Sequence, residues 1–272
     1  MTEDQVRQFL DDTSSVEGWF FPIDVSLFAA LDEIQKREGI TGDLFEIGVH
    51  HGKSAILLGR MLNDGERLGV CDVFGQQELN VDHSGEGSRD LFLRNLSRYA
   101  PAAVDGLRVF CKRSDQLTAE ETTTRCRFIH IDGGHRPADV VNDLQVAERA
   151  LLADGIVVVD DPFNPSWPGV GEGLYDYFAR QPRAFAPIVI GGNKAYFVRE
   201  AATERYRPWL ERIANGEFFQ SPAFRFESKE WLGCRVLTAS RREWVDLRPI
   251  AAAQTHLRGS ALRKWLLKLI PN

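Results

Sequence analysis

Two short apolar runs near the middle of the chain each end in aspartate. Residues 128–131 lead directly into Asp132, and residues 156–159 lead into Asp160 and Asp161. Both runs are rich in β-branched side chains, which is typical of strands buried on both faces of a parallel sheet. Apolar residues recur at helical spacing between the two runs, so the pattern over 128–161 predicts a βαβ unit with its helix at 140–152.

Strand and helix patterns alternate on both sides of this unit. Further strands are predicted at 44–47, 67–73, 107–111, 185–190 and 194–198, and helices at 22–37, 53–61 and 88–99. The segment Gly191-Gly192-Asn193 is suited to turn a closing hairpin. These elements predict an α/β fold: a seven-stranded, doubly wound, Rossmann-like sheet with helices on both faces.

The same pattern divides the chain into three parts. We expect an N-terminal helical segment at 1–41, a core at 42–200 and a C-terminal cap at 201–272. The last stretch, 261–270, is basic and amphipathic; packing against the body or a partner subunit is favoured over contact with a membrane surface, so a homo-oligomer is possible. Aromatic residues make the third part too apolar for a disordered tail: Trp209, Phe218, Phe219, Phe224, Phe226, Trp231 and Trp244.

Composition restricts the partners and the compartment. A formal charge of −6 offers no basic excess to neutralise phosphates, so we expect no nucleic-acid partner. The chain shows neither the charged flank and apolar run of a signal peptide nor a segment long enough to span a membrane. Its four cysteines form no CxxC pair, and two of them lie in or beside predicted core strands, which indicates small buried thiols in a reducing compartment. We therefore expect a cytoplasmic protein.

A glycine-containing loop follows the first core strand and leads into a helix. Gly48 and Gly52 are separated by three residues, whereas a phosphate-binding P-loop has four between its glycines. The dinucleotide fingerprint GxGxxG also fails, because residues 49–51 hold no second glycine. The loop retains an acid, Glu46, a first glycine for close backbone approach and a second that admits the helix.

This loop resembles the first motif of class I S-adenosylmethionine (SAM) methyltransferases, E/D-x-G-x-x-x-G. The resemblance implies that Glu46, Gly48, Gly52 and Ser54 belong to the SAM site. It also implies that Asp72, at the end of the second strand, binds the ribose hydroxyls. Just after the third strand, Ser114 stands where this class contacts adenine.

Two neighbouring features have alternative interpretations. His50 and His51 are adjacent in the loop, and adjacent side chains are expected to diverge, so we do not predict them as metal ligands. The aromatic segment 17–22 is either a hydrophobic staple under the first helix or part of a lid over a ligand.

The two acid-ended strands predict a second chemical feature. Neighbouring strands lie about 4.8 Å apart, and ligands bind at the carboxyl ends of strands in open α/β sheets. Asp132, Asp160, Asp161 and His135 should therefore gather at one edge. An all-oxygen site is suited to Mg²⁺ or Mn²⁺. Because successive strand side chains face opposite ways, the chain must leave strand geometry by Asp161 for both acids to bind one ion.

The wider pattern resembles metal-dependent O-methyltransferases, in the branch that methylates sugars of macrolides and aminocoumarins. The resemblance covers residues 42–200 and rests on Ile-Asp-Gly-Gly-His at 131–135 and Asp-Asp at 160–161. It implies that Asp132, Asp160 and Asp161 are metal ligands and that Asp132 also contacts the SAM cofactor. His135 is then the general base, because an imidazole exchanges protons near neutral pH. His83, in the polar loop 80–87, is a rival base, and His130 is expected to be a core histidine.

These observations predict a SAM- and Mg²⁺-dependent O-methyltransferase acting on a sugar hydroxyl. Its acceptor would be a small molecule or an oligosaccharide, such as a glycosylated natural product or a methylated mannoside precursor. Two alternatives remain: a metal-dependent hydroxylase of the same fold, and a non-catalytic subunit with a SAM-type fold that organises a complex through its cap.

Overall fold

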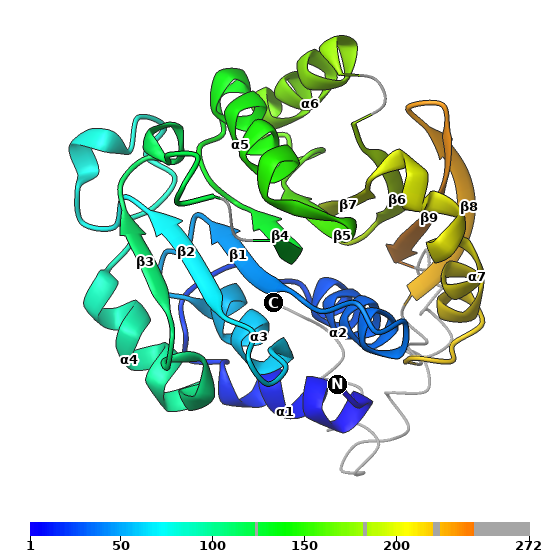
Figure 1. Ribbon diagram of the computed structural model, residues 1–272, viewed down its shortest axis with the longest axis horizontal. Coiled ribbons are helices and arrows are strands. Elements are labelled where there is room, and N and C mark those ends of the chain that lie inside the picture. Colours follow the sequence, from blue (N-terminus) through cyan, green and yellow to red (C-terminus); the bar gives the residue numbers. More distant parts are fainter. Residues whose placement is uncertain (123–124, 182–183, 220–223, 242–272) are drawn as a thin grey trace, which may run out of the picture.

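The computed structural model describes residues 1–122, 125–181, 184–219 and 224–241. Its centre is a nine-stranded sheet with the order β3-β2-β1-β4-β5-β7-β6-β9-β8 (Figure 1). The strands are β1 (Asp43–Ile47), β2 (Leu68–Asp72), β3 (Arg108–Cys111), β4 (Cys126–Ile131), β5 (Leu151–Asp160), β6 (Ala186–Ile190), β7 (Lys194–Val198), β8 (Phe224–Trp231) and β9 (Cys234–Arg241).

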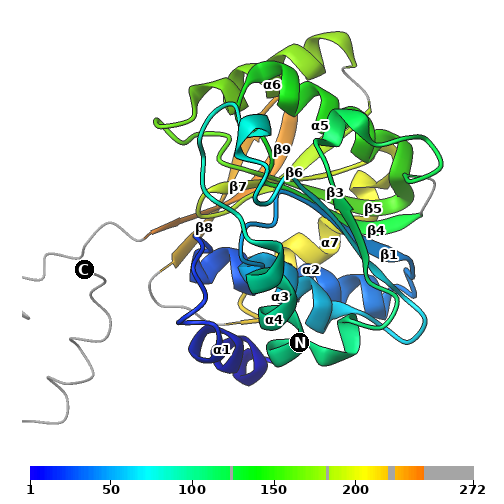
Figure 2. The ribbon, with the colours of Figure 1, turned by 90° about the vertical axis from the view of Figure 1, so that its left-hand side faces the viewer.

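Helices cover both faces of the sheet (Figure 2). The helices α5 and α6 lie on one face, and the other helices of the described residues lie on the opposite face. The helices are α1 (Glu3–Asp12), α2 (Pro22–Arg37), α3 (Lys53–Met61), α4 (Arg89–Tyr99), α5 (Pro137–Ala150), α6 (Pro168–Arg180) and α7 (Thr203–Ala214). The predicted α/β architecture with a doubly covered sheet is confirmed.

The central strands are apolar on both sides because helices pack against both. Phe128 of β4 and Val158 of β5 face the core under α2 and α3, whereas Ile129 and Val157 face the core under α5 and α6. All four side chains are fully buried. Burying a side chain of this size contributes about 1.5–3 kcal/mol, so alternate residues of each strand hold the two helical layers in place.

Parallel pairing brings the functional ends of the strands to one edge. β1 pairs in parallel with β2 and β4, and β4 pairs in parallel with β5. The register places Ile47 beside Ile131 and Ile131 beside Val159. The residues that follow these three positions therefore leave the sheet side by side, as the βαβ pattern predicts.

The strand count differs from the prediction of seven. The segment expected to form a separate cap supplies two more strands: β8 and β9 form an antiparallel hairpin, and β9 pairs in parallel with β6. Leu232 and Gly233 turn this hairpin, both with positive φ. The physical reason is that β6 has a free edge, which β9 covers at Val189 and Ile190.

The part of the chain that the structure describes contains no helix that is long and apolar enough to cross a membrane. Trp244 and the basic stretch at 261–270 lie outside the described residues, so the role expected for that stretch stays a prediction.

Candidate active site

A cavity of about 720 Å³ opens at the carboxyl ends of the strands. The loops that follow β1, β2, β4 and β5 line it, together with the turn between β6 and β7 and the aromatic segment 17–21. Ligand sites for molecules of cofactor size commonly have about 300–1,000 Å³. The edge that the sequence singled out is thus a cavity of suitable size.

Gly48 allows two loops at this edge to touch. It has φ +81°, and a Cβ at this position would overlap the main-chain carbonyl oxygen of Asp132. Gly52 has φ +88° at the N-terminus of α3, where a Cβ would lie 2.6 Å from the Phe92 ring. Both glycines are therefore needed for steric and conformational reasons. Gly48 lines the cavity, whereas Gly52 supports the helix behind it.

Asp72 holds the glycine loop in shape. Its carboxylate accepts hydrogen bonds from the main-chain N–H groups of Val49 and Phe74, and from that of His50 at 2.8 Å. The side chain also lines the cavity. It lies at the end of β2 as predicted, and its proposed contact with ribose hydroxyls would come in addition to this structural task.

Glu46 lies behind the cavity wall. Its carboxyl group is fully buried and lies 2.7 Å from Nδ1 of His130, at the hydrogen-bonding distance. Burial raises the pKa of Glu46 well above its usual range, opposed in part by the Ser54 hydroxyl. Burial, reinforced by nearby Lys194, lowers the pKa of His130. Ser54 lines the cavity, whereas Glu46 is not among the residues that line it.

A buried lysine lies inside the acid cluster, which the sequence analysis did not foresee. Lys194, at the start of β7, is 1% exposed, and its Nζ lies 2.6 Å from Oδ2 of Asp160. Burial alone would lower the pKa of Lys194, but Asp160, Asp132 and Asp24 outweigh burial and raise it. The three acids therefore favour the charged form of the lysine at this edge. Register places it there, because Asp160 of β5 pairs with Lys194 of β7.

The turn that carries Lys194 is fixed by the N-terminal helical segment. Asp24, in the first turn of α2, accepts hydrogen bonds from the main-chain N–H groups of Gly192 and Asn193, both at 3.2 Å. Its Oδ1 also accepts a hydrogen bond from the Tyr196 hydroxyl at 2.8 Å. These contacts between distant parts of the sequence hold the β6–β7 turn against the site.

Asp160 and Asp161 point in different directions. Asp161 has φ +59°, so the chain leaves strand geometry where the sequence analysis required it to. Oδ1 of Asp161 accepts hydrogen bonds from the side-chain amides of Asn164 at 2.9 Å and Asn193 at 3.1 Å. Its Oδ2 lies 3.9 Å from Nε2 of His135. Asp161 therefore faces the histidine, and Asp160 faces the lysine.

This arrangement differs from the predicted metal site. Among the described residues, the groups of potential ligands whose atoms lie within 4.8 Å of one another are His130, Asp132 and Asp160, and Glu17, His50 and His51. Asp132 and Asp160 do come together, but Asp161 is turned towards His135 and the amides. The sequence could not show this, because it depends on the backbone reversal at Asp161 and on the pairing of β5 with β7.

His135 has a carboxylate partner that the sequence analysis missed. Its ring Nδ1 lies 2.9 Å from Oδ2 of Asp82, which also accepts a hydrogen bond from the His135 main-chain N–H at 2.6 Å. Partial burial acts to raise the pKa of Asp82, but the hydrogen bonds from His135 outweigh it and hold that pKa well below its usual range. The ring stacks on Trp167, with centroids 4.1 Å apart. The imidazole is thus held with Nε2 directed towards Asp161.

Of the remaining predicted residues, Ser114 lies in the cavity wall and His83 does not. Ser114 lines the cavity at the start of a short 3₁₀ turn after β3, and it accepts a hydrogen bond from Asn142 at 3.2 Å. His83 is exposed and is not part of the cavity lining, whereas Asp82 beside it is. The polar loop 80–87 therefore contributes a carboxylate to the site, and the rival base lies outside it.

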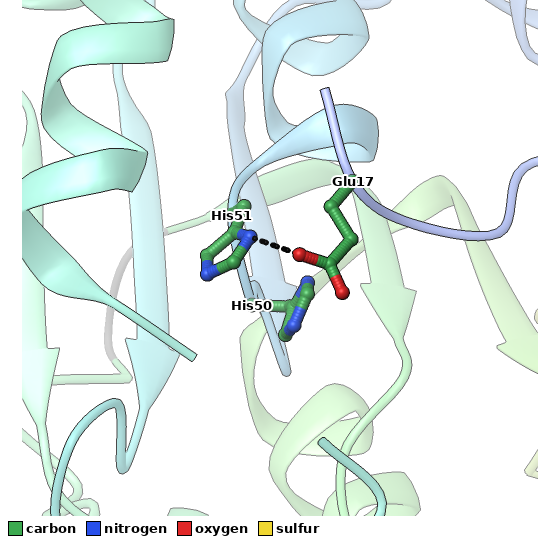
Figure 3. Close-up of side chains that lie close together, drawn as sticks. All are labelled: Glu17, His50 and His51. Carbon is green, nitrogen blue, oxygen red and sulfur yellow. Dashed lines mark ion pairs between the residues drawn. The ribbon is translucent and has the colours of Figure 1, made fainter. Parts of the chain in front are cut away.

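The expectation that His50 and His51 diverge is wrong. Their rings stack with centroids 3.9 Å apart, and the Glu17 carboxylate lies 3.3 Å from Nδ1 of His51 (Figure 3). His50 has φ +51°, and this left-handed conformation turns the two side chains to the same side of the loop. Burial, reinforced by His51, lowers the pKa of His50.

The sheet order, the glycine loop after β1 and the acid at the end of β2 are the features that the sequence predicted for a fold of the class I SAM methyltransferase type. Residues 45–162 match the family model of a methyltransferase domain. The matched segment begins in β1 and ends just after Asp161, and it includes both Gly48 and Asp132.

Solved structures share this fold. The O-methyltransferase NovP has a TM-score of 0.55 and 20% identity, over 67% of this chain and 83% of its own. Cofactor-bound Rv0187 from MTB has a TM-score of 0.50 and 15% identity, over 73% and 90% of the two chains. The SAH-bound methyltransferase PaMTH1 of Podospora anserina has a TM-score of 0.50 and 13% identity, over 72% and 88%. None of the curated protein sequences matches this chain.

Proposed function

We propose that the chain transfers a methyl group from SAM to a hydroxyl oxygen of a sugar-containing acceptor, with His135 as the general base. The observation that carries this proposal is the pairing of His135 with Asp82, which leaves Nε2 of the ring directed into a cavity shared with the Gly48 loop. A hydroxyl nucleophile needs a group that accepts its proton, and a histidine held by a carboxylate is a common solution.

The residues present fit SAM. Gly48 leaves no room for a side chain where its loop meets Asp132, and Ser54, Asp72 and Ser114 all line the same cavity. Asp72 is placed to bind ribose hydroxyls, and Ser114 to contact the adenine. When bound, SAM supplies an electrophilic methyl group on a sulfonium, which an oxygen nucleophile can displace in line. The cation is favoured by Asp132 and Asp161, which also line the cavity.

His135 accepts the acceptor's proton at Nε2. The hydrogen bond with Asp82 fixes the ring orientation and stabilises the imidazolium that forms. Asp161 lies near enough to Nε2 to attract the same charge, at 3.9 Å. Trp167 stacks on the ring and limits its rotation. Holding the acceptor oxygen and the methyl carbon in line accounts for a further part of the rate.

Sugar acceptors are favoured by the aromatic rim of the cavity. Trp19 is 73% exposed, Phe163 55% and Phe21 46%, and all three line the opening. Exposed aromatic side chains around a cavity commonly mark a ligand-binding surface. Their flat apolar faces match the C–H faces of sugar rings, while the carboxylates below them match hydroxyl groups. The acceptor is therefore proposed to be a glycoside or an oligosaccharide.

The residues do not fit the Mg²⁺ or Mn²⁺ site predicted at Asp132, Asp160 and Asp161. Lys194 pairs with Asp160 at 2.6 Å, and the amides of Asn164 and Asn193 bind Oδ1 of Asp161. The positive charge that the acid cluster requires is thus supplied by the chain itself. We propose that His135 and Lys194, rather than a divalent ion, provide the base and the counter-charge.

The test is methyl transfer from labelled SAM to a panel of glycosides, with the wild type and His135→Gln. We expect label in a glycoside with the wild type, and a loss of transfer of about 10²–10⁴-fold in His135→Gln, with SAM affinity unchanged in calorimetry. His83→Gln is the matched control and should retain full activity. Full transfer by His135→Gln would refute the assignment of the base, and failure of the wild type to bind SAM would refute the whole proposal.

A further inference from the structure

Glu17, His50 and His51 form a second group of potential metal ligands, apart from the acid cluster. One carboxylate oxygen and one nitrogen of each ring all lie within 4.8 Å of one another. Figure 3 shows the Glu17 carboxylate reaching towards both rings from the segment before α2. The group thus joins the N-terminal segment to the loop after β1, which shapes the cofactor site.

Two further contacts hold the segment of Glu17 against this loop. Lys53, at the start of α3, donates a hydrogen bond from Nζ to the main-chain oxygen of Gly18 at 3.0 Å. The Trp19 ring lies beside His50, with centroids 6.2 Å apart. The position of Glu17 relative to the histidines is therefore supported by the two residues that follow it.

One atom of the group lacks a well-formed hydrogen bond. Nδ1 of His50 is buried, and its one neighbour for such a bond among the described residues is the Glu17 main chain, which does not meet hydrogen-bond geometry. A buried nitrogen without a partner costs about 1–3 kcal/mol. His51 differs, because its Nδ1 already faces the Glu17 carboxylate. A bound cation would satisfy the free nitrogen and neutralise the carboxylate together.

We propose that Glu17, His50 and His51 bind a divalent transition metal of the Zn²⁺ type. Two imidazoles and one carboxylate, with a position left for water, form a common ligand set for this ion. Zinc–ligand distances of about 2.0–2.2 Å require the ligand atoms to approach one another more closely and the rings to leave their stack. Glu17 has the freedom to move towards the rings, since its side chain is 65% exposed.

The acid cluster is a weaker competitor for such an ion. One potential ligand atom each of His130, Asp132 and Asp160 also lies within 4.8 Å of the others, but Lys194 already pairs with Asp160 there. The positive charge of Lys194 repels a second cation. Among the described residues no lysine or arginine forms an ion pair with Glu17, and Nζ of Lys53 bonds to the main-chain oxygen of Gly18 instead, so the carboxylate is offered without this competition.

Metal binding at this group would close the N-terminal segment over the cofactor loop. Glu17 lies two residues before Trp19, which lines the rim of the cavity, and His50 donates its main-chain N–H to Asp72. An ion bound to both segments would therefore link the aromatic rim to the glycine loop. We expect slower exchange of bound SAM when the metal is present, with no requirement for the metal in methyl transfer itself.

Calorimetry with Zn²⁺ on the full, metal-stripped chain tests the proposal, supported by the visible spectrum of bound Co²⁺. We expect one equivalent of Zn²⁺ to bind to the wild type, and at least 10-fold weaker binding in His51→Gln and in Glu17→Gln. His83→Gln removes an exposed histidine and should bind as the wild type does. Circular dichroism checks that each variant is folded.

Two results would overturn the proposal. Equal Zn²⁺ affinity in the wild type, His51→Gln and Glu17→Gln would place the ion elsewhere. Loss of the same Zn²⁺ binding in Asp160→Asn would assign it to the acid cluster. Because the measurement is metal binding and not methyl transfer, these outcomes are independent of whether the proposed methylation of sugars is correct.

Discussion

Replacing Lys194 by methionine removes the cation that the structure places among the acids. The side chain keeps a similar length, but Asp160 loses its partner at 2.6 Å, and Asp132 loses a neighbouring positive charge. Two unit charges about 4 Å apart interact by about 4 kcal/mol at an effective dielectric constant of about 20. Breaking a buried pair commonly costs about 3–5 kcal/mol. We therefore expect Lys194→Met to lower the free energy of unfolding by about 3–5 kcal/mol.

Urea unfolding in EDTA and in Mg²⁺ or Mn²⁺ measures this effect and separates two explanations. If Lys194 occupies the place of a metal, the variant gains an ion site, so the divalent ions should restore part of its stability. The wild type should unfold identically in EDTA and in Mg²⁺, an ion that imidazole ligands do not suit, and its methyl transfer should not change in EDTA. Lys229→Met is the matched control: Lys229 pairs with Glu227 at 2.9 Å on an exposed strand. Surface pairs contribute about 0–1 kcal/mol.

Two outcomes contradict this reasoning. Loss of wild-type turnover in EDTA, restored by Mg²⁺, would show that a divalent ion binds despite the lysine. A cost for Lys194→Met no larger than that for Lys229→Met would show that Asp160 has little need of a cation. Lys194→Arg, which keeps the charge, indicates whether a large loss arises from charge or from packing.

Three further variants test other parts of the site. Asp82→Asn should lower kcat by up to about 10⁴-fold at unchanged SAM affinity. Adding it to His135→Gln should cause no further loss, because Asp82 acts through that ring; additive losses would contradict this. Gly48→Ala should weaken SAM binding more than 10-fold, since the added Cβ overlaps the Asp132 carbonyl. Gly65 also has a positive φ, +83°, but open space around it, so the control Gly65→Ala should lower the free energy of unfolding by only about 1 kcal/mol. Burial raises the pKa of Asp143 to about 7 in the folded protein, compared with about 3.9 in an unfolded chain. Between these two values the folded state binds more protons than the unfolded state, so the free energy of unfolding falls as pH rises from 4 to 7. Asp143→Asn lacks this loss of up to about 4 kcal/mol, so its stability relative to the wild type should increase over that range in urea unfolding; a constant difference would contradict the shift.

The sequence predicted the parts of the site that depend on local patterns. Apolar runs ending in Asp132 and Asp160 located the sheet edge, because burial on both faces leaves a clear signal in single strands. Asp82 and Lys194 were missed because each acts across a long separation in the chain. A polar loop gives no sign of which of its side chains will meet a histidine. A lysine at the start of a strand looks solvated until the partner strand is known.

The nine-stranded sheet illustrates the same limit in the fold. The alternation of polar and apolar residues over 224–231 and the Leu232-Gly233 turn are local signals of a hairpin. Its attachment to β6 is not local, because it depends on the edge left free beside Val189. The C-terminal aromatics indicated order in this region, but order alone does not distinguish a separate cap from an extension of the sheet.

The charges around the cavity connect the lysine to the proposed reaction. Asp82, Asp132 and Asp161 line the cavity, where Lys194 offsets one acid charge of the cluster. The remaining negative field favours both positive charges of the reaction, the sulfonium before transfer and the imidazolium of His135 after it. Because methyl transfer would leave a neutral thioether, the demethylated cofactor would lose this attraction. In the proposed reaction, an internal cation that neutralises the cluster only in part would therefore favour binding of the charged cofactor and release of the neutral product, whereas a divalent ion in the same position would weaken both effects.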